Sequence, residues 1–511
     1  MLRTLWCIAG ASAIFLALAS PGFAQKSKDT LRYPIDDAEA SLDRYLVPGS
    51  FANQWEPSVF DNLIGFDPKK GQFVPMLAKS WSQPDPLTYE FELRADVTFH
   101  NGEKFDADDV VYTLNYLIDP KVKLRYKQSW AWIKSVEKLS PYKVRVNAKE
   151  PNPDGLMWLA FGTPMYPQEL HGGLADKQAF GPRPVGTGPY KIVKLEKNIG
   201  VVAEKYAGFV PGPMKPKPAI GRIVAEPVTD TGTLVASLLT DQIDVAVNLP
   251  MDQALNLRDT GRFDVTLSPP RLGYIYLQFP TAAWGTAKPL ADVRVRTAIA
   301  KAIDRKVLLK AVYGPLADKL KPTEGLCSKE QLGCGYTKMV PDYDPAGAKK
   351  LLAEAGYPDG FDVSISGYRE NAPHMTAISG MLREVGIRAT VRTHHNSQRL
   401  KLIQDGKVEI GYYGWSGGNM FTVSPQIVRH LQAGEYADPE FAKLVDPIFK
   451  TMDDTERRKL AAKAFDRLHD MAYTYPMITN REIFTHTKEV AIRSPEDLRP
   501  MIISPHEFVW K

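Results

Sequence analysis

Alternating apolar and polar positions near residue 90 predict the first clear element of secondary structure. Segment 87–94 has an apolar side chain at every second position, which is the period of a strand with one buried face. The pair Asn101-Gly102 then suits the positive φ angles of a tight hairpin. Segment 106–118 carries apolar residues at helical spacing, and Asp106 can cap its first turn. We therefore expect a strand, a hairpin and a helix in this order.

The second half of the chain alternates between the two patterns. Asp344-Pro345 predicts the capped start of a helix, and Gly356 suits the left-handed residue that follows its end. Beyond it we expect, in chain order, a strand at 361–366, a helix at 375–384, a strand at 387–392, a helix at 397–404 and a strand at 408–413. Strands and helices that alternate in this way indicate an α/β domain whose sheet is covered by helices.

The N-terminal segment has the pattern of a secretory signal peptide. Arg3 supplies a basic start, an apolar run extends from Leu5 to Ala19, and Gly22 and Ala24 are the small residues of a cleavage site. The apolar run is too short for a stable membrane-spanning helix. We expect cleavage after Ala24, which makes residues 1–24 the signal and places the mature protein in the periplasm. An uncleaved membrane anchor is the alternative.

Length and charge narrow the class of protein. The chain has 511 residues, too many for a single hydrophobic core and enough for two or three domains. Its formal net charge is +5, with Lys and Arg spread along the chain instead of gathered in blocks. We therefore expect no nucleic-acid partner.

Two cysteines remain after the N-terminal segment. Cys327 and Cys334 lie in a polar loop bounded by glycines. In an oxidising compartment this spacing predicts a local disulfide, with two free thiols as the alternative. A metal site would need further ligands nearby, and the loop has none.

Several segments resemble the family 5 extracellular solute-binding proteins, which include the dipeptide- and oligopeptide-binding components of ABC importers. The matching segments follow the order of the family; they are 76–94, 97–102, 107–114, 184–191, 241–246, 290–305 and 343–361. The resemblance implies a two-lobed α/β clamp of the periplasmic-binding-protein type (type II-like), with an extra inserted subdomain. It also implies a monomeric binding protein, not an enzyme, with no cofactor and no metal.

The same resemblance implies how the chain divides and what it does. We expect a first lobe from 26–68, 186–278 and 484–511, an inserted subdomain at 69–185, and a second lobe at 279–483. A small polar solute, whether peptide-like, opine-like or sugar-like, should lie between the lobes and be enclosed by hinge closure. The partners would be ABC permease subunits at the inner membrane.

Segment 409–421 is the most informative candidate for the binding site. A strand that ends at Gly414 and a glycine-containing loop would bring an aromatic side chain and bare backbone to a sheet edge, where α/β folds bind ligands. Trp415 would form an apolar wall, Gly417 would offer backbone, and Asn419 would supply a neutral donor and acceptor. Tyr413 belongs to the same candidate site, with the core of the lobe as the alternative for both aromatic residues.

Arg369 is a second candidate for the binding site. It follows the strand expected at 361–366, a place that resembles the one where dipeptide-binding relatives carry a carboxylate-binding arginine. Such an arginine could hold an anionic group of the solute bidentately. The alternative is a surface arginine that is solvated or paired with Glu370.

The loop after Trp415 departs from the peptide-binding relatives. In those relatives an aspartate follows the tryptophan within a few residues and pairs with the ammonium group of the peptide. Here no carboxylate occurs between Trp415 and Glu435. We therefore expect poor binding of ordinary peptides with a free α-amino group, because a buried ammonium ion without a counter-charge is costly. An aspartate from elsewhere, such as Asp37, could substitute.

Other motifs point to other functions. Gly414-Trp-Ser-Gly-Gly418 matches the Gly-x-Ser-x-Gly spelling of a hydrolase nucleophile, Ser416, but the segment that follows is a poor helix start. His394-His395 could suggest metal binding, but neighbours on a strand point to opposite faces. An exported hydrolase and a sensory or chaperone-like binding protein are therefore the alternative functions.

Overall fold

The computed structural model describes most of the chain after its N-terminal segment. The described ranges are 29–35, 41–47, 50–67, 70–124, 127–228, 230–268, 273–395, 398–414, 422–424, 427, 436–493 and 503–511. The signal peptide predicted at 1–24 lies outside them. Among the described residues, no helix is long and apolar enough to cross a membrane.

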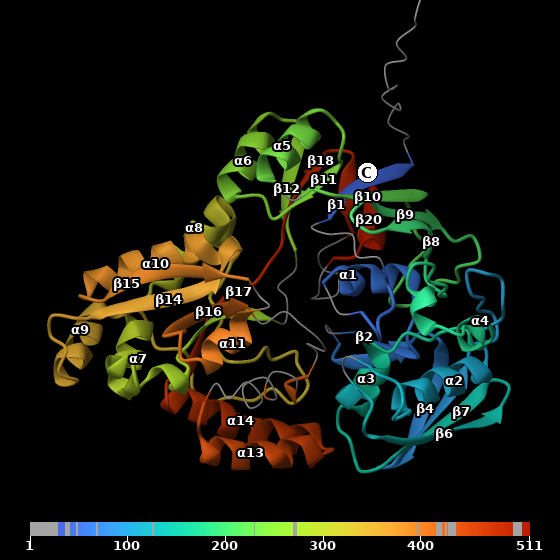
Figure 1. The fold of residues 1–511 in the computed structure, drawn as a ribbon, viewed down its shortest axis with the longest axis horizontal. Helices are drawn as coiled ribbons and strands as arrows, with labels where there is room; N and C mark the ends of the chain where they lie inside the picture. The colour runs from blue at the N-terminus through green and yellow to red at the C-terminus, as the bar shows by residue number, and fades with distance from the viewer. Residues whose placement is uncertain are drawn as a thin grey trace, which may run out of the picture.

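The first lobe, on the right in Figure 1, is built on two four-stranded sheets. One sheet has the order β1 (Thr30–Ile35), β10 (Arg222–Pro227), β9 (Gly200–Lys205), β8 (Tyr190–Glu196), with β1 and β10 parallel and the other neighbours antiparallel. The other is antiparallel, in the order β4 (Ala78–Asp85), β5 (Thr88–Leu93), β7 (Lys143–Ala148), β6 (Ile133–Ser140).

Smaller elements complete this lobe. They are α1 (Ser50–Val59), the hairpin of β2 (Ile64–Asp67) and β3 (Gln72–Pro75), α2 (Ala107–Ile118), α3 (Gly155–Ala160), α4 (Gln168–Gly173), and a C-terminal pair of β19 (Val490–Ile492) and β20 (Phe508–Trp510). One continuous apolar core runs through both sheets and these elements.

The strand, hairpin and helix predicted near residue 100 are confirmed. The strand is β5, and Gly102 has a φ of 91° in the turn that follows. Helix α2 begins after a capping box, in which the Asp106 carboxylate accepts from Asp108 N and the Asp109 carboxylate accepts from Asp106 N. These elements form where expected because their signals are local in sequence.

The second lobe, on the left in Figure 1, is built on a five-stranded sheet. Its order is β15 (Arg388–His394), β14 (Asp362–Tyr368), β16 (Ile410–Gly414), β13 (Tyr274–Gln278), β17 (Thr474–Thr479), and β13 is antiparallel to both of its neighbours. The helices of this lobe are α7 (Val293–Lys301), α8 (Arg305–Tyr313), α9 (Pro345–Glu354), α10 (Ala372–Glu384), α11 (Arg399–Gln404), α13 (Pro439–Lys450) and α14 (Asp454–Asp470). The alternation predicted for residues 344–413 is confirmed.

Both faces of β13 are buried. Along β13, Ile275 and Leu277 contribute to one apolar cluster, while Tyr274 and Tyr276 contribute to another on the opposite face. We expected residues 274–278 in the first lobe, but they pair with β16 and β17 in the five-stranded sheet. A strand that is apolar at every position fits either core, which is why its pattern does not assign it.

A small three-stranded sheet joins the lobes. Its order is β11 (Val245–Val247), β18 (Ile483–Thr487), β12 (Phe263–Leu267), flanked by α5 (Thr231–Leu239) and α6 (Met251–Asp259), at the top of Figure 1. Val245 and Phe484 belong to the core of the first lobe, whereas Ala246 and Ile483 belong to that of the second. Because successive strand residues face opposite sides, this hinge sheet is anchored in both lobes.

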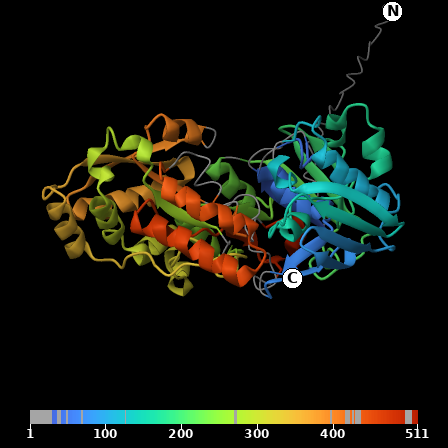
Figure 2. The ribbon, with the colours of Figure 1, turned by 90° about the horizontal axis from the view of Figure 1, so that it is seen from below.

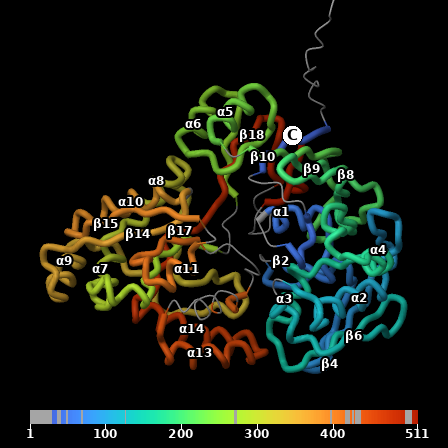
Figure 3. The backbone as a smooth tube through the Cα atoms, in the orientation of Figure 1, coloured from blue at the N-terminus to red at the C-terminus, as the bar shows by residue number. Residues whose placement is uncertain are grey.

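Two segments connect the hinge sheet to the second lobe; one follows β12 and the other precedes β18. Figure 3 shows the crossing from β17 to β18 in red. There Glu482 N donates to Ser268 Oγ at 2.9 Å, and Ser268 N donates to Glu482 O at 2.9 Å. The segments that follow β12 and precede β18 are therefore tied to each other where they leave the hinge sheet.

The predicted disulfide is confirmed. Cys327 and Cys334 are bonded, with their Cα atoms 5.8 Å apart, and both side chains are buried in the second lobe. The loop that they close lies against the start of α14, since Gly333 N donates to Asp454 Oδ1 at 2.7 Å.

Candidate ligand-binding site

The carboxyl ends of three strands form one edge of the second lobe's sheet. β14, β15 and β16 are parallel, so Tyr368, His394 and Gly414 meet at this edge. The edge is directed toward the first lobe (Figure 1). Ligands in α/β folds commonly bind outside the carboxyl ends of strands, which makes this edge the candidate site.

Arg369 lies at this edge. It follows β14 directly and opens the short helix η6 (Arg369–Asn371). Its side chain is exposed, and the described part of the chain gives its guanidinium no hydrogen bond or ion pair. A guanidinium at the sheet edge could receive an anionic group of a solute.

Tyr413 lies in the core behind the edge. Its side chain is fully buried, and its hydroxyl lies 2.9 Å from His394 Nε2. Its ring contacts Tyr368 at 5.3 Å and lies under the Arg399 guanidinium at 5.2 Å. Tyr413 thus supports the wall of the site from behind, which corresponds to the core alternative; direct contact with a solute stays a prediction.

Both ring nitrogens of His394 are in contact with neighbours. His394 Nδ1 lies 3.0 Å from His395 O, and its Nε2 contacts the Tyr413 hydroxyl. Within the described residues, no group of three or more His, Cys, Asp or Glu side chains could hold a metal ion.

The remaining predicted site residues lie outside the described part of the chain. These are Trp415, Ser416, Gly417 and Asn419, together with Asp37. Because β16 ends at Gly414, the first of them follows the sheet edge directly. Their roles stay predictions.

The structure adds two groups that the sequence did not point to, one buried and one half-buried. Arg399, in the first turn of α11, is buried over Tyr413. His374, in the first turn of α10, has its Nδ1 3.4 Å from the Tyr412 hydroxyl, and burial lowers its pKa to about 4. Both lie in helices that follow strands of this sheet, and that position was the one signal available in the sequence.

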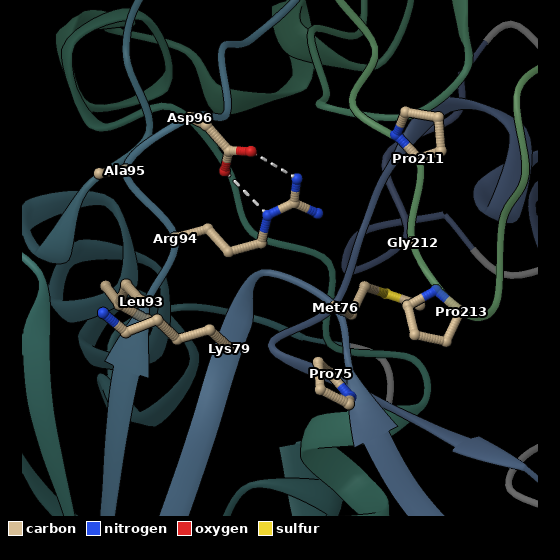
Figure 4. A pocket seen from close by; sticks show the side chains of 10 residues that line it. All are labelled: Pro75, Met76, Lys79, Leu93, Arg94, Ala95, Asp96, Pro211, Gly212 and Pro213. Carbon is tan, nitrogen blue, oxygen red and sulfur yellow. Dashed lines mark hydrogen bonds and ion pairs between the residues drawn. The ribbon is translucent and has the colours of Figure 1, made fainter.

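A hollow away from this edge lies in the first lobe. It has a volume of about 550 Å³ and is lined by the ends of β3 and β5, by β4 and by residues 211–213 (Figure 4). Arg94 and Asp96 form an ion pair at its wall, with Nε and Oδ1 2.9 Å apart. All of its lining residues belong to the first lobe, so it is no part of a site between the lobes.

Comparisons with known proteins cover nearly the whole chain. The model of the bacterial extracellular solute-binding proteins, family 5 Middle, matches residues 72–433. The glutathione-binding protein GsiB of Pectobacterium atrosepticum is 26% identical over 513 residues, which cover 95% of this chain and 94% of that protein.

Solved structures give the same picture of the fold. NikA of Brucella suis, in complex with Fe(III)-EDTA, matches with a TM-score of 0.80 at 22% identity, over 94% of this chain and 100% of NikA. AgaA of A. tumefaciens R10, in complex with agropinic acid, matches with a TM-score of 0.70 at 21% identity, over 94% of this chain and 99% of AgaA. At this identity the likeness shows the fold, and it confirms the expected α/β periplasmic-binding-protein architecture.

The family assignment also decides between the classes of function. Its members are transport binding proteins and not enzymes, so the alternative of an exported hydrolase with Ser416 as nucleophile is set aside. The family match covers more than half of the chain. The chain therefore belongs to the family 5 bacterial extracellular solute-binding proteins, the solute-binding components of ABC importers.

Proposed function

We propose that this protein is a monomeric periplasmic receptor, exported by a cleaved signal peptide at 1–24, that delivers one small polar solute to ABC permease subunits in the inner membrane. The solute is peptide-like, opine-like or sugar-like. It lies between the first lobe and the carboxyl edge of β14, β15 and β16. The division into two lobes and an inserted subdomain is part of this proposal.

One observation carries the proposal furthest. The hinge sheet contributes side chains to the cores of both lobes, and the two segments that leave it are bonded to each other at Ser268 and Glu482. Such a joint lets two rigid bodies rotate while neither core is opened. The sheet edge that carries Arg369 faces the first lobe and would approach it as the lobes close.

The chemistry at the edge favours a polar, partly anionic solute. Arg369 would pair with an anionic group, Asn419 with hydroxyl or amide groups, and Trp415 would cover an apolar part. The relatives fit this range, since one is named for binding glutathione and another was solved with agropinic acid.

The test begins with the protein's own solute. The mature chain is purified from the periplasm without refolding, and the small molecules released on unfolding are identified by mass spectrometry. We expect one polar organic compound in a 1:1 ratio to the chain. A chain that carries no compound, and whose unfolding temperature no peptide, opine, sugar or metal chelate raises, would contradict the proposal.

A further inference from the structure

We propose that Asp154 and Arg457 form a latch between the lobes, which sets how strongly the clamp stays closed. The inference rests on the proposed function only in that closure is what retains the solute. Both are positioning residues for binding. The proposal comes from their juxtaposition across the two lobes, 303 residues apart in sequence.

The contact is an ion pair with two hydroxyl partners. Arg457 Nη2 donates to Asp154 Oδ1 at 2.7 Å and to Ser424 Oγ at 2.6 Å. Thr422 Oγ1 donates to the same Asp154 oxygen at 2.6 Å. Asp154 thus receives an arginine and a hydroxyl from the second lobe, and the contact forms only when the lobes meet.

Burial makes this contact more than a surface ion pair. The exposed fraction is 1% for Arg457 and 4% for Asp154. Asp154 stands at the N-cap position of α3 but does not cap that helix, so its carboxylate is directed to the other lobe. A charge buried at this depth is tolerated because its partner is present, and loss of one partner strongly disfavours the buried arrangement.

The contact lies far from the hinge. In Figure 1 the hinge sheet is at the top, whereas α13 and α14 lie at the bottom and α3 lies in the lower half, and Figure 2 shows α13 and α14 extending toward the first lobe. Lys450 in α13 has its pKa raised by Asp446 first and then by Glu150 of the first lobe, so the two lobes approach along this rim. A bond far from the hinge resists opening most effectively, because the lobes separate most at the end opposite the hinge.

The disulfide loop holds the second-lobe half of the latch. Arg458 Nη1 donates to Cys334 O at 2.9 Å, and Val423 N donates to Leu332 O at 3.1 Å. A Cβ on Gly333 would lie 3.1 Å from Arg457 Nε, so the loop leaves the arginine little room to move. Leu332 itself packs against the core of the first lobe, which adds an apolar contact beside the ion pair.

The experiment measures the distance between the lobes in mature chain that has been stripped of its co-purified solute by unfolding and refolding. Spin labels at Lys134 of the first lobe and Lys443 of the second, both exposed, report the closed and open populations by pulsed electron paramagnetic resonance. We expect Asp154→Asn and Arg457→Met each to lower the ratio of closed to open protein about tenfold or more. The change in the free energy of closure in the double variant should be smaller than the sum of the two single changes, because the double variant leaves no unpaired charge.

The matched control is Lys459→Met, which removes an exposed ion pair with Glu456 in the same helix. It should leave the distances unchanged. The latch is disproved if the single variants keep the wild-type distances, or if the wild-type protein has no closed population. A general loss of stability would lower the unfolding temperature without changing the ratio, which also overturns the proposal. None of these outcomes bears on transport, because no solute is involved.

Discussion

His100 is held between two backbone groups of the turn at 186–188. Its Nε2 lies 2.9 Å from Gly188 O, and Gly186 N donates to its Nδ1 at 3.3 Å. The ring is therefore neutral, with the proton on Nε2, because a second proton on Nδ1 would face an N–H group. Burial lowers the pKa of His100 to about 4.

This geometry predicts a pH dependence of stability. The folded pKa is below the unfolded one, so the unfolded chain binds the extra proton between pH 6.5 and 4, and stability is lost as pH falls through that window. At pH 4.5 His100 should account for a loss of about 2 kcal/mol relative to pH 7. Urea unfolding of wild type and His100→Gln, which donates similarly but does not titrate, tests this; equal losses in both proteins would contradict it.

Arg369 offers a direct test at the edge of the sheet. If it pairs with an anionic group inside the closed clamp, Arg369→Ala should weaken binding of the co-purified solute at least about tenfold, since a charge-assisted pair is lost. Isothermal titration calorimetry gives the dissociation constant. Arg388→Ala is the control, because it removes an exposed pair with Asp362 in the same lobe. An unchanged dissociation constant in Arg369→Ala rules the role out.

The loop after Trp415 predicts which solutes are rejected. No carboxylate follows Trp415 before Glu435, so a buried ammonium ion would lack a counter-charge and lose several kcal/mol, about enough to abolish tight binding. A calorimetric panel of di- and tripeptides with free amino groups should show no sub-micromolar binding. Binding of one such peptide with a dissociation constant below one micromolar would show that another carboxylate pairs with its ammonium group.

At the scale of elements, the disulfide loop is a support for α14. Gly333 N and Cys334 O bond to Asp454 and Arg458 of α14, and Leu332 O accepts from Val423 N. The Cys327→Ser/Cys334→Ser variant should unfold with a free energy lower by about 2 kcal/mol, because the closed loop is short. Urea denaturation measures the difference. A larger closed population in the variant than in wild type would contradict the supporting role.

Local elements were predictable because their signals are local. Asp106 and Asp344 cap α2 and α9, and alternation in β5 and β15 marks their strands. The assignment of β13 to one lobe was not predictable, because a strand buried on both faces has no polar side to orient it. The pairing of the two cysteines followed from spacing and compartment together.

At the scale of the whole molecule, long-range contacts limit what the sequence reveals. Nothing in the residues around Asp154 or Arg457 marks them as partners, since each also fits an ordinary helix start. Tyr413 looked equally suited to site and core, and only the contacts with His394 and Arg399 place it behind the site. The location of the candidate site was predictable, because it depends on where a strand ends.

The central claim is that the two lobes close on a solute, and small-angle X-ray scattering tests it most directly. The mature chain is stripped of its co-purified solute by unfolding and refolding, and scattering is recorded before and after that solute is added back. We expect a smaller radius of gyration with solute, because the lobes rotate about the sheet of β11, β18 and β12. Identical scattering in the two states, with binding verified by calorimetry, would contradict it.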